Sequence, residues 1–480
     1  MDVVCYAFVC EGHHDRGRLV SLLALLGDGS KATFITPGDP GGGGVPAAPA
    51  APTEPGSFDY IVTPGENLTT YLSGKPAGST YYLQNGSYSF LNAVPQAGDQ
   101  FWGQSRTGVI IDGTSHGAQP GTPGAPGPDR TAFKGSVDDV LITRMTIRNY
   151  GVGTDGGLQE QAGIMCKAAH WSGSISDGWR IHDVTLNNNG NGGIYMGHNT
   201  VITSCEIYGH GNTGIGGAYI VGGTIQGNII RNNANSPVEG AGDNGGGIKI
   251  VNANQRGPHI AMPTFAQVKV IDNDVYENYP SAGNGRPIWF DIDCHDVYIG
   301  YNRVTESTGG LFGIMWELCN GGIAEFNTIT GAIGYAGWAG SNFQGAAMQA
   351  AESHNIVFRY NTVDGANVGY MNRLSARGTA ELGNNNDNYI DTLLGRGELA
   401  NSHAVITNVN QLSNIGCSTN SCIGNVFIDV DAWGDNYGSG ESGNGHPTTH
   451  TYSGNDVSQS PGIVHYYNGV AAPFPGNGRT

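Results

Sequence analysis

Charged residues are scarce in this sequence, and basic residues are fewer than acidic ones. Only 13% of the 480 residues are Asp, Glu, Lys or Arg, and 22 basic against 40 acidic side chains give a net charge of −18. A protein that binds the phosphate backbone of nucleic acid needs a basic surface, so this class of partner is excluded. No apolar run approaches the roughly 20 residues of a membrane-spanning helix, so we expect no membrane span.

Glycine, by contrast, is abundant. The 79 glycines are more than twice the average usage of about 7%, and they lack the Gly-X-Y period of collagen. Gly and Asn are both poor residues for a helix interior. The composition therefore predicts a β-rich protein.

Local composition and residue pattern divide the chain into four segments. Residues 1–36 hold an apolar stretch after two arginines and are expected to be a leader or a disordered N-terminus. Residues 37–57 form a Pro/Gly/Ala-rich linker that cannot pack a core and is expected to act as a tether. Residues 58–430 read as short strands and turns, and residues 431–480 as a C-terminal cap and tail.

A motif of the form apolar-x-x-Asn-x-(Val/Ile) recurs through the third segment, with Cys205 in the same slot of a related copy. Its central residues are Asn228, Asn273, Asn302, Asn327 and Asn361. A repeat of about 25 residues with insertions cannot bury its own apolar face, whereas stacked copies can. The sequence therefore predicts an all-β fold, a single-stranded right-handed parallel β-helix, in which the Asn side chains form a turn ladder about 4.8 Å apart.

The stretch from about Phe58 to Asn361 resembles the pectate-lyase-like right-handed parallel β-helix repeat proteins. Its opening, FDYIVTPGENLTTYLSGKPAGSTYYLQNGSYSF, resembles the segment by which many of them enter the helix, and GVIIDGTS looks like their first coil. The resemblance implies a secreted, extracellular protein whose partner is a polysaccharide. It leaves the reaction open, because this fold hosts lyases, hydrolases, epimerases, phage tailspikes and adhesins. An oligomer is also compatible with it.

A second set of strands lies between the Asn turns, and apolar alternation sets their register. In this register Asp291 and Glu317 occupy one outward column on adjacent coils, and Lys249 lies one coil from Asp291. The outward candidates are Tyr195, Lys249, Trp289, Asp291, Asp293, Met315, Glu317 and Gln349. Stacked carboxylates repel each other, so a pair of this kind needs a cation, a shared proton or a neighbouring Lys.

Insertions flank these strands and are expected to wall a groove, because loops on a rigid scaffold commonly carry function. They occupy residues 231–245, 252–266, 277–287 and 331–346. On the groove floor, Trp289 is expected to be an exposed platform for a sugar ring. Tyr195, Met315 and Gln349 are the other candidates for substrate binding.

The favoured reaction is β-elimination on a uronic-acid glycan. GGGIKI at Gly245–Ile250 looks like the Gly-rich strand that offers a base Lys in some calcium-dependent pectate lyases. Lys249 would remove the proton α to the carboxylate, which requires a neutral amine. Asp291, Asp293 and Glu317 would hold Ca²⁺, which takes several oxygen ligands.

Two alternatives remain open. A glycoside hydrolase would use Asp291 and Glu317 as its carboxylate pair, at a separation resembling the roughly 5–5.5 Å of retaining enzymes. A non-catalytic surface β-helix would only bind glycan in the groove. Gly209-His210-Gly211 resembles a polygalacturonase motif, but the companion motifs of that family are missing, and His210 is expected to be a turn residue.

The chain has eight cysteines, and none has the C-x-x-C spacing of a zinc site. We therefore expect disulfides or buried thiols. Cys417 and Cys422 bracket a single loop. Cys294 and Cys319 lie near one column on neighbouring coils and would staple them if their Cα atoms lie within about 7 Å.

Overall fold

The computed structural model describes most of the chain from residue 44 onward, and residues 45–480 form one unit. The described ranges are 44–116, 130–151, 162–168, 174–234, 245–254, 267–278, 286–292, 294–306, 312–317, 319–331, 346–351, 353–373, 421–423, 425–428, 432–437, 451–453, 455–459, 464–467 and 470–472.

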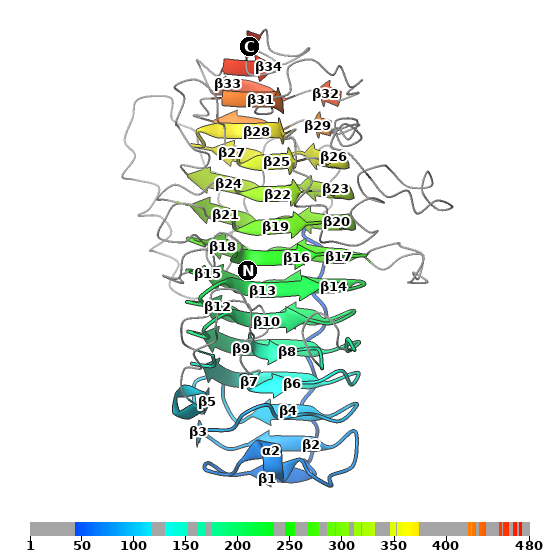
Figure 1. Ribbon diagram of the computed structural model, residues 1–480, viewed down its shortest axis with the longest axis vertical. Coiled ribbons are helices and arrows are strands. Elements are labelled where there is room, and N and C mark those ends of the chain that lie inside the picture. The colour runs from blue at the N-terminus through cyan, green and yellow to red at the C-terminus, as the bar shows by residue number, and fades with distance from the viewer. Residues whose placement is uncertain are drawn as a thin grey trace, which may run out of the picture. The chain divides into compact units, whose positions relative to one another are not determined.

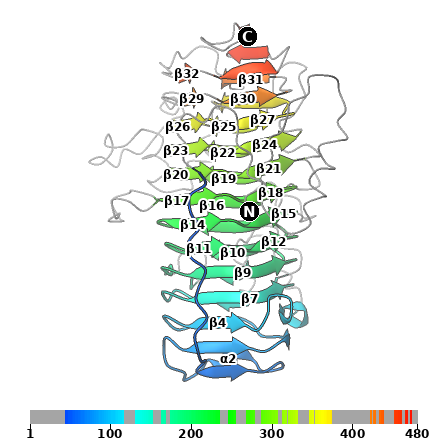
Figure 2. The same ribbon diagram turned by 180° about the vertical axis from the view of Figure 1, so that it is seen from behind.

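The unit is a stack of coils, each of which contributes strands to the same faces (Figures 1 and 2). One face is a 12-stranded sheet, here called the site sheet. Its strands are β6 (Phe133–Lys134), β8 (Ala162–Met165), β10 (Gly192–Met196), β13 (Thr213–Ala218), β16 (Gly246–Val251), β19 (Ile288–Asp291), β22 (Ile314–Glu317), β25 (Met348–Ala351), β28 (Val368–Arg373), β31 (Ala432–Tyr437), β34 (Val464–Tyr467) and β35 (Val470–Ala472).

The remaining walls belong to a 23-stranded sheet. Its strands are β1 (Tyr60–Val62), β2 (Thr80–Leu83), β3 (Gly86–Tyr88), β4 (Gln100–Gly103), β5 (Val109–Asp112), β7 (Leu141–Arg148), β9 (Arg180–Asn187), β11 (Val201–Thr203), β12 (Glu206–Tyr208), β14 (Gly223–Gln226), β15 (Ile229–Arg231), β17 (Val268–Ile271), β18 (Asp274–Tyr276), β20 (His295–Gly300), β21 (Arg303–Glu306), β23 (Asn320–Glu325), β24 (Thr328–Gly331), β26 (His354–Arg359), β27 (Thr362–Asp364), β29 (Ser421–Ile423), β30 (Val426–Ile428), β32 (Thr451–Ser453) and β33 (Asp456–Gln459). Helical turns are few among the described residues: α2 (Leu68–Tyr71) and the 3₁₀ turn η1 (Thr114–His116).

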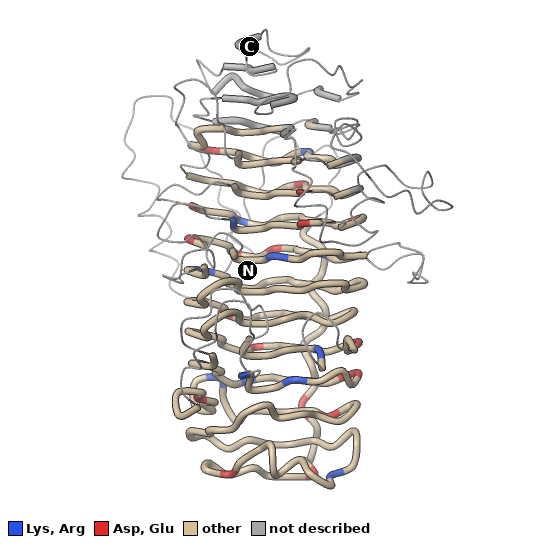
Figure 3. The backbone as a smooth tube through the Cα atoms, viewed as in Figure 1, with Lys and Arg blue, Asp and Glu red and all other residues tan. Residues whose placement is uncertain are grey.

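The predicted fold is confirmed: neighbouring coils pair in parallel, and the coils wind as a right-handed parallel β-helix. Alternate residues of each strand point into the coil interior, as the apolar alternation predicts. Ile250, Phe290 and Trp316 are fully buried in one continuous core cluster. Charged side chains are sparse along the coils (Figure 3), so apolar burial dominates the stabilisation of the stack.

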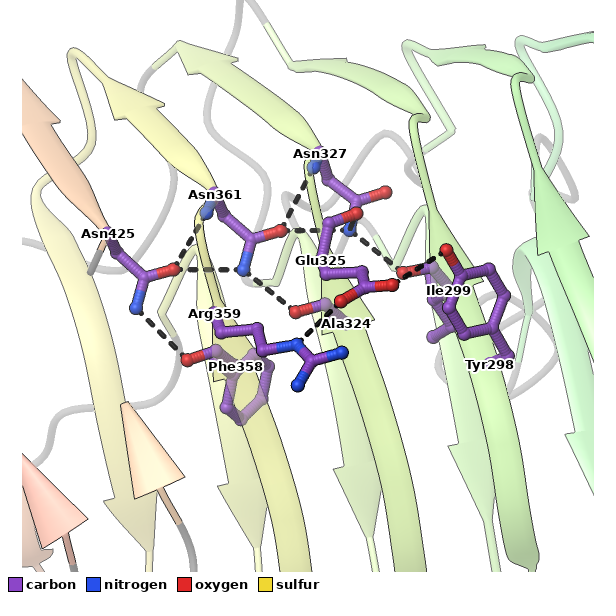
Figure 4. Close-up of polar contacts among 9 residues, drawn as sticks. All are labelled: Tyr298, Ile299, Ala324, Glu325, Asn327, Phe358, Arg359, Asn361 and Asn425. Carbon is purple, nitrogen blue, oxygen red and sulfur yellow. Dashed lines mark hydrogen bonds and ion pairs between the residues drawn. The ribbon is translucent and has the colours of Figure 1, made fainter. Parts of the chain in front are cut away.

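The Asn ladder is present, and it is longer than the sequence motif predicted. In each step the backbone N and the Nδ2 of one Asn donate to Oδ1 of the Asn on the next coil; from Asn302 to Asn327 these distances are 2.9 and 3.0 Å. Cys205 begins the series, with its backbone N donating to Asn228 Oδ1. Asn425 extends it past Asn361 (Figure 4). The backbone N of Asn425 in turn donates to Asn455 Oδ1.

The described part of the predicted tether is bound along the coils and is not a free linker. Residues 45–56, here called the strap, run past several strands of the 23-stranded sheet (Figure 2). Arg180 Nη2 donates to the carbonyl of Ala50 at 2.7 Å, and Gln226 Nε2 donates to that of Pro46 at 2.7 Å. Glu54 adds an ion pair with Arg144 at 2.8 Å. The predicted leader, residues 1–36, lies outside the described residues.

The parallel stack continues past residue 430, where the sequence analysis placed the start of a cap. Strand β31 pairs in parallel with β28, and β34 pairs with β31. Among the strands that the structure describes, β35 alone reverses direction, and it pairs antiparallel with β34. Within the described ranges, no helix is long and apolar enough to cross a membrane.

Candidate functional site

The outward register predicted for the site sheet is confirmed. Trp289 pairs with Lys249 on one side and with Met315 on the other. Gln349 follows Met315 in the same column. In the adjacent column Asp291 pairs with Glu317. Four consecutive coils therefore present two parallel columns of side chains on the face away from the core.

Glycines before Lys249 let two coils approach closely. A Cβ on Gly246 would lie 2.0 Å from the carbonyl oxygen of Arg286, and one on Gly247 would lie 2.6 Å from that of Pro287. Only glycine fits at such distances. The Gly-rich start of β16 is therefore explained by coil packing, and it places Arg286 beside the column of Lys249.

Lys249 and Asp291 form a buried ion pair. Lys249 Nζ lies 3.4 Å from Asp291 Oδ2, and the two side chains are 7% and 9% exposed. Burial lowers the pKa of Lys249 to about 8, and the positive charge of Arg286 adds to this effect, while Asp291 acts in the opposite direction. Desolvation thus outweighs the attraction of the carboxylate, and a substantial fraction of Lys249 is neutral near pH 8.

Trp289 is buried, which corrects the expectation of an exposed sugar platform. Its side chain is 3% exposed and packs in a cluster with Phe312 and Met315. Lys249 Nζ lies 3.6 Å from the centroid of the indole, and Arg286 Cζ lies 4.2 Å from it. The indole therefore contacts two cations, and its ring face is not free to stack on a sugar in this structure.

Arg286 and Phe312 were not predicted as site residues. Arg286 fell in the predicted insertion 277–287, and Phe312 was not a candidate. Phe312 lies 5.6 Å from Arg286 Cζ. The available signal was their position: each stands two residues before the first residue of a site-sheet strand, Ile288 or Ile314.

The other substrate-binding candidates are also covered. Met315 is 2% exposed, and Gln349 is fully buried. Tyr195 is 2% exposed and lies in the same column, two coils from Lys249, beyond Gly216. Lys167, itself 1% exposed, has its Nζ 5.7 Å from the Tyr195 ring.

The predicted groove walls lie largely outside the described residues, as does Asp293. Among residues the structure describes, no group of three or more His, Cys, Asp or Glu is arranged to hold a metal ion. Ca²⁺ takes six to eight oxygen ligands, and the carboxylate of Asp291 already faces an ammonium group. Asp291 and Glu317 alone do not fit a Ca²⁺ site.

The predicted Cys294–Cys319 disulfide is wrong, because both residues are buried thiols. Cys294 Sγ donates to the carbonyl of Asp291 at 3.2 Å, and Cys319 Sγ donates to that of Glu317 at 3.1 Å. Burial raises the pKa of the Cys319 thiol well above its ordinary value. Cys422 is a thiol that donates to Asn455 Oδ1 within the ladder, and Cys417 lies outside the described residues.

His210 is a turn residue, as expected. Its Nδ1 accepts from the backbone N of Asn189 at 3.1 Å, and its own N donates to Asn233 Oδ1 at 3.2 Å. Asn233 in turn donates to Asn278, whose N donates to Glu306 Oε1. Burial lowers the pKa of His210 to about 3 and raises that of Glu306 to about 8. Burial therefore favours the neutral form of both groups, which belong to a second turn ladder.

The stack of parallel coils with Asn ladders has the pectate-lyase-like right-handed parallel β-helix fold. A scan against protein-family models found no match to this chain. A search of curated proteins by sequence found no relative.

Solved structures share the fold. A mutant of the PL6 family alginate lyase AlyGC is 13% identical, with a TM-score of 0.52 over 85% of this chain and 49% of that chain. The A-module of the mannuronan C-5 epimerase AlgE6 of Azotobacter vinelandii is 13% identical, with a TM-score of 0.48 over 79% of this chain and 90% of that chain. The periplasmic alginate epimerase AlgG is 10% identical, with a TM-score of 0.46 over 85% and 82%. Identities this low establish similarity of fold alone.

Proposed function

We propose that this protein is a polysaccharide-acting β-helix enzyme that cleaves a uronic-acid glycan by β-elimination, with Lys249 as the base. One observation carries the proposal: a lysine buried on the outer face of the site sheet has a pKa lowered to about 8 although it pairs with a carboxylate. A base needs a pKa near the working pH. Perturbed ionisable groups of this kind concentrate at functional sites.

The reaction assigns a role to each charged neighbour. Neutral Lys249 takes the proton from the carbon α to the uronate carboxylate. The electron pair left on that carbon forms a double bond to the β carbon and expels the glycosidic oxygen, which takes a proton from water and leaves as a hydroxyl group. Asp291 stabilises the ammonium that Lys249 becomes, and the Arg286 guanidinium attracts the substrate carboxylate and the negative charge that develops on it.

The PL6 neighbour is an alginate lyase. Alginate is therefore the first uronan to offer the protein, and we propose that the protein acts outside the cytoplasm on a polymer of this class. Lyase action on alginate itself is part of the proposal.

A glycoside hydrolase is the second candidate, and the register favours it. Asp291 pairs with Glu317 on the adjacent strand, at a strand spacing of about 4.8 Å, close to the carboxyl separation of roughly 5–5.5 Å in retaining enzymes. In that case new reducing ends form on a neutral glycan without an unsaturated product. Asp291→Asn and Glu317→Gln would each abolish them.

The deciding experiment follows ultraviolet absorbance of unsaturated product on a panel of uronans, with and without a chelator. We expect absorbance to rise with the wild type and Lys249→Met to reduce the rate at least 1000-fold, by loss of the base. Lys269→Met is the matched control, because Lys269 is an exposed lysine on β17 of the other sheet. A rate lost on chelation would show that a metal ion is required.

Absence of both unsaturated product and new reducing ends on every glycan would refute both enzymatic functions. A glycan-binding role without catalysis would then be the remaining interpretation. Equal rates for wild type and Lys249→Met would refute the role of Lys249 in particular.

A further inference from the structure

The outer column of the site sheet contains polar atoms without partners. Gln349 is fully buried, and neither its Oε1 nor its Nε2 has a hydrogen-bond partner in the described part of the chain. Two coils away in the same column, the buried Nε1 of Trp289 also has no hydrogen-bond partner among the described residues. Unpaired buried polar groups are costly, and native proteins satisfy the great majority of them, so each exception calls for an explanation.

The amide belongs to the same site as Lys249. Its strand neighbours Met348 and Ala350 pack in the coil core, so Gln349 projects from the opposite face. Met315 lies between Gln349 and Trp289 in the column. Met315 also packs with Trp289 in the cluster that contains Phe312. One continuous floor therefore connects the ion pair at one end with the unpaired amide at the other.

The two ends of this floor suit different chemical groups. At one end the guanidinium of Arg286 lies against Trp289, beside the amine of Lys249, and suits a carboxylate. The amide of Gln349 offers a donor and an acceptor side by side. A carboxylate would satisfy only the donor and would repel Oε1, whereas hydroxyl groups both donate and accept. Gln349 therefore fits the hydroxyl groups of a sugar.

We propose that Gln349 is a specificity-determining residue that binds sugar hydroxyls three coils from Lys249, about 14 Å along the stack at the spacing of parallel strands. This inference rests on the proposed function, because it takes the uronate carboxylate to lie at Lys249 and Arg286. The glycan then runs across the strands, and only fragments long enough to span both ends contact Gln349. Gln349 and Trp289 are buried in this structure, so binding of the glycan requires side chains around them to change rotamer.

The test compares wild type with Gln349→Met, which keeps the length of the side chain and removes its hydrogen-bonding groups. Binding of alginate fragments from disaccharide to hexasaccharide is measured by calorimetry, and cleavage by absorbance. We expect Kd and KM for the longest fragments to rise about tenfold through loss of one or two hydrogen bonds. Values for the disaccharide and kcat stay unchanged. The Tm stays equal or rises, because an unpaired buried amide has been removed.

Met371→Leu is the matched control, since Met371 is the next buried residue of the same column and carries no hydrogen-bonding group comparable to the amide. It should leave all binding constants within about twofold of wild type. A lower Tm for Gln349→Met with unchanged Kd would show that the amide is structural or holds only a buried water, and would overturn the inference.

The remaining outcomes separate this inference from the proposed function. If wild type binds the fragments but does not cleave them, the lyase function fails, and the ratio of Kd values still decides the role of Gln349. If wild type cleaves and Gln349→Met shows the same KM at every length, the inference alone fails. If wild type binds no fragment, both are overturned.

Discussion

Lys249 shows how burial can override an ion pair at a single residue. A carboxylate 3.4 Å away normally raises the pKa of a lysine, yet the pKa of Lys249 is lowered to about 8. Removing an ammonium from water is costly, and one acidic partner does not compensate for it when a guanidinium lies nearby. The charges of Asp291 and Arg286 shift the pKa of Lys249, so substitutions of these two residues test it.

The proposed base predicts the pH dependence of the reaction. The neutral amine is the active form, so kcat/KM should rise with pH, reach half its maximum near pH 8 and level off above it. Arg286→Gln removes a positive charge that lowers the pKa of Lys249, so the half-maximum should move to higher pH. Asp291→Asn removes the charge that raises this pKa, so it should move to lower pH.

The measurement is kcat/KM on one uronan across pH for the three proteins. Arg286→Gln is also expected to lower the rate at the plateau, because Arg286 attracts the substrate carboxylate. A rising limb that stays at the same pH in both variants would contradict Lys249 as the titrating group.

For single residues, the sequence predicted correctly which side chains point away from the core, but not whether they are exposed to solvent. Alternation with Ile248 and Ile250 was enough to place Lys249 on the outer face, because a one-residue error would have put a lysine in the core. Trp289 was expected to be exposed because nothing in its strand predicts what covers it. Arg286 and Phe312, which pack against it, stand two residues before their strands begin, outside the apolar alternation that set the register.

At the scale of the element, the Asn ladder is the feature that local sequence predicted best. Each copy places Asn after a residue with positive φ, such as Tyr301 before Asn302 or Phe326 before Asn327. The slot is buried, and its neighbours are backbone groups and the next amide, so few other side chains satisfy it. Asn425 was missed because Phe427 stands where the motif has Val or Ile. Asn455 has Val457 at that position, and its copy differs only in having Tyr452 where the other copies have a Val, Ile, Ala or Phe.

Removing one amide from the middle of the ladder should be strongly destabilising. Asn302→Ala leaves Asn273 N and Nδ2 without their acceptor and removes the donor to the carbonyls of Val270 and Gly300. We expect the free energy of unfolding to fall by about 2–4 kcal/mol, since each buried unpaired group costs about 1–3 kcal/mol. Unfolding in denaturant, followed by circular dichroism, measures it.

The control for this substitution is Asn85→Ala, at an exposed position outside the ladder. The substitution removes one exposed hydrogen bond, from Ser105 Oγ to Asn85 Oδ1, so it should lower the free energy of unfolding by no more than about 1 kcal/mol. A similar small change for Asn302→Ala would mean that the ladder contributes little to the stability of the coils.

At the scale of the whole unit, composition alone misjudged the strap. A Pro/Gly/Ala-rich tract without large apolar side chains predicts a linker, and residues 45–56 indeed bury no core. They are held instead through their backbone carbonyls by Arg180 and Gln226. Backbone acceptors are present in every sequence, so no pattern within the tract could reveal this docking.

Replacing residues 46–55 by Gly and Ser of equal length tests the docking. Proline holds the strap extended in the unfolded chain as well, so its loss raises the entropic cost of docking. We expect the Tm to fall by about 1 °C, corresponding to about 1 kcal/mol in a unit of this length, while the β signal in circular dichroism stays unchanged. Glu54→Gln, which removes only the ion pair with Arg144, should lower the Tm by less. An unchanged Tm for the replaced strap would show that it does not stabilise the coils.

The direction of the ladder gives this solenoid an electrical polarity. From Asn228 to Asn425, every Nδ2 donates one N–H to Oδ1 of the next Asn toward the C-terminal end, so each accepting Oδ1 faces the N-terminal end. The other N–H of each Nδ2 donates to a backbone carbonyl of the preceding coil. The side-chain amide dipoles therefore add head to tail, as peptide dipoles do in a helix. Each polarised amide strengthens the next. Parallel strands alone contribute little net moment, so a row of asparagines provides the coil stack with a positive pole toward its C-terminal end.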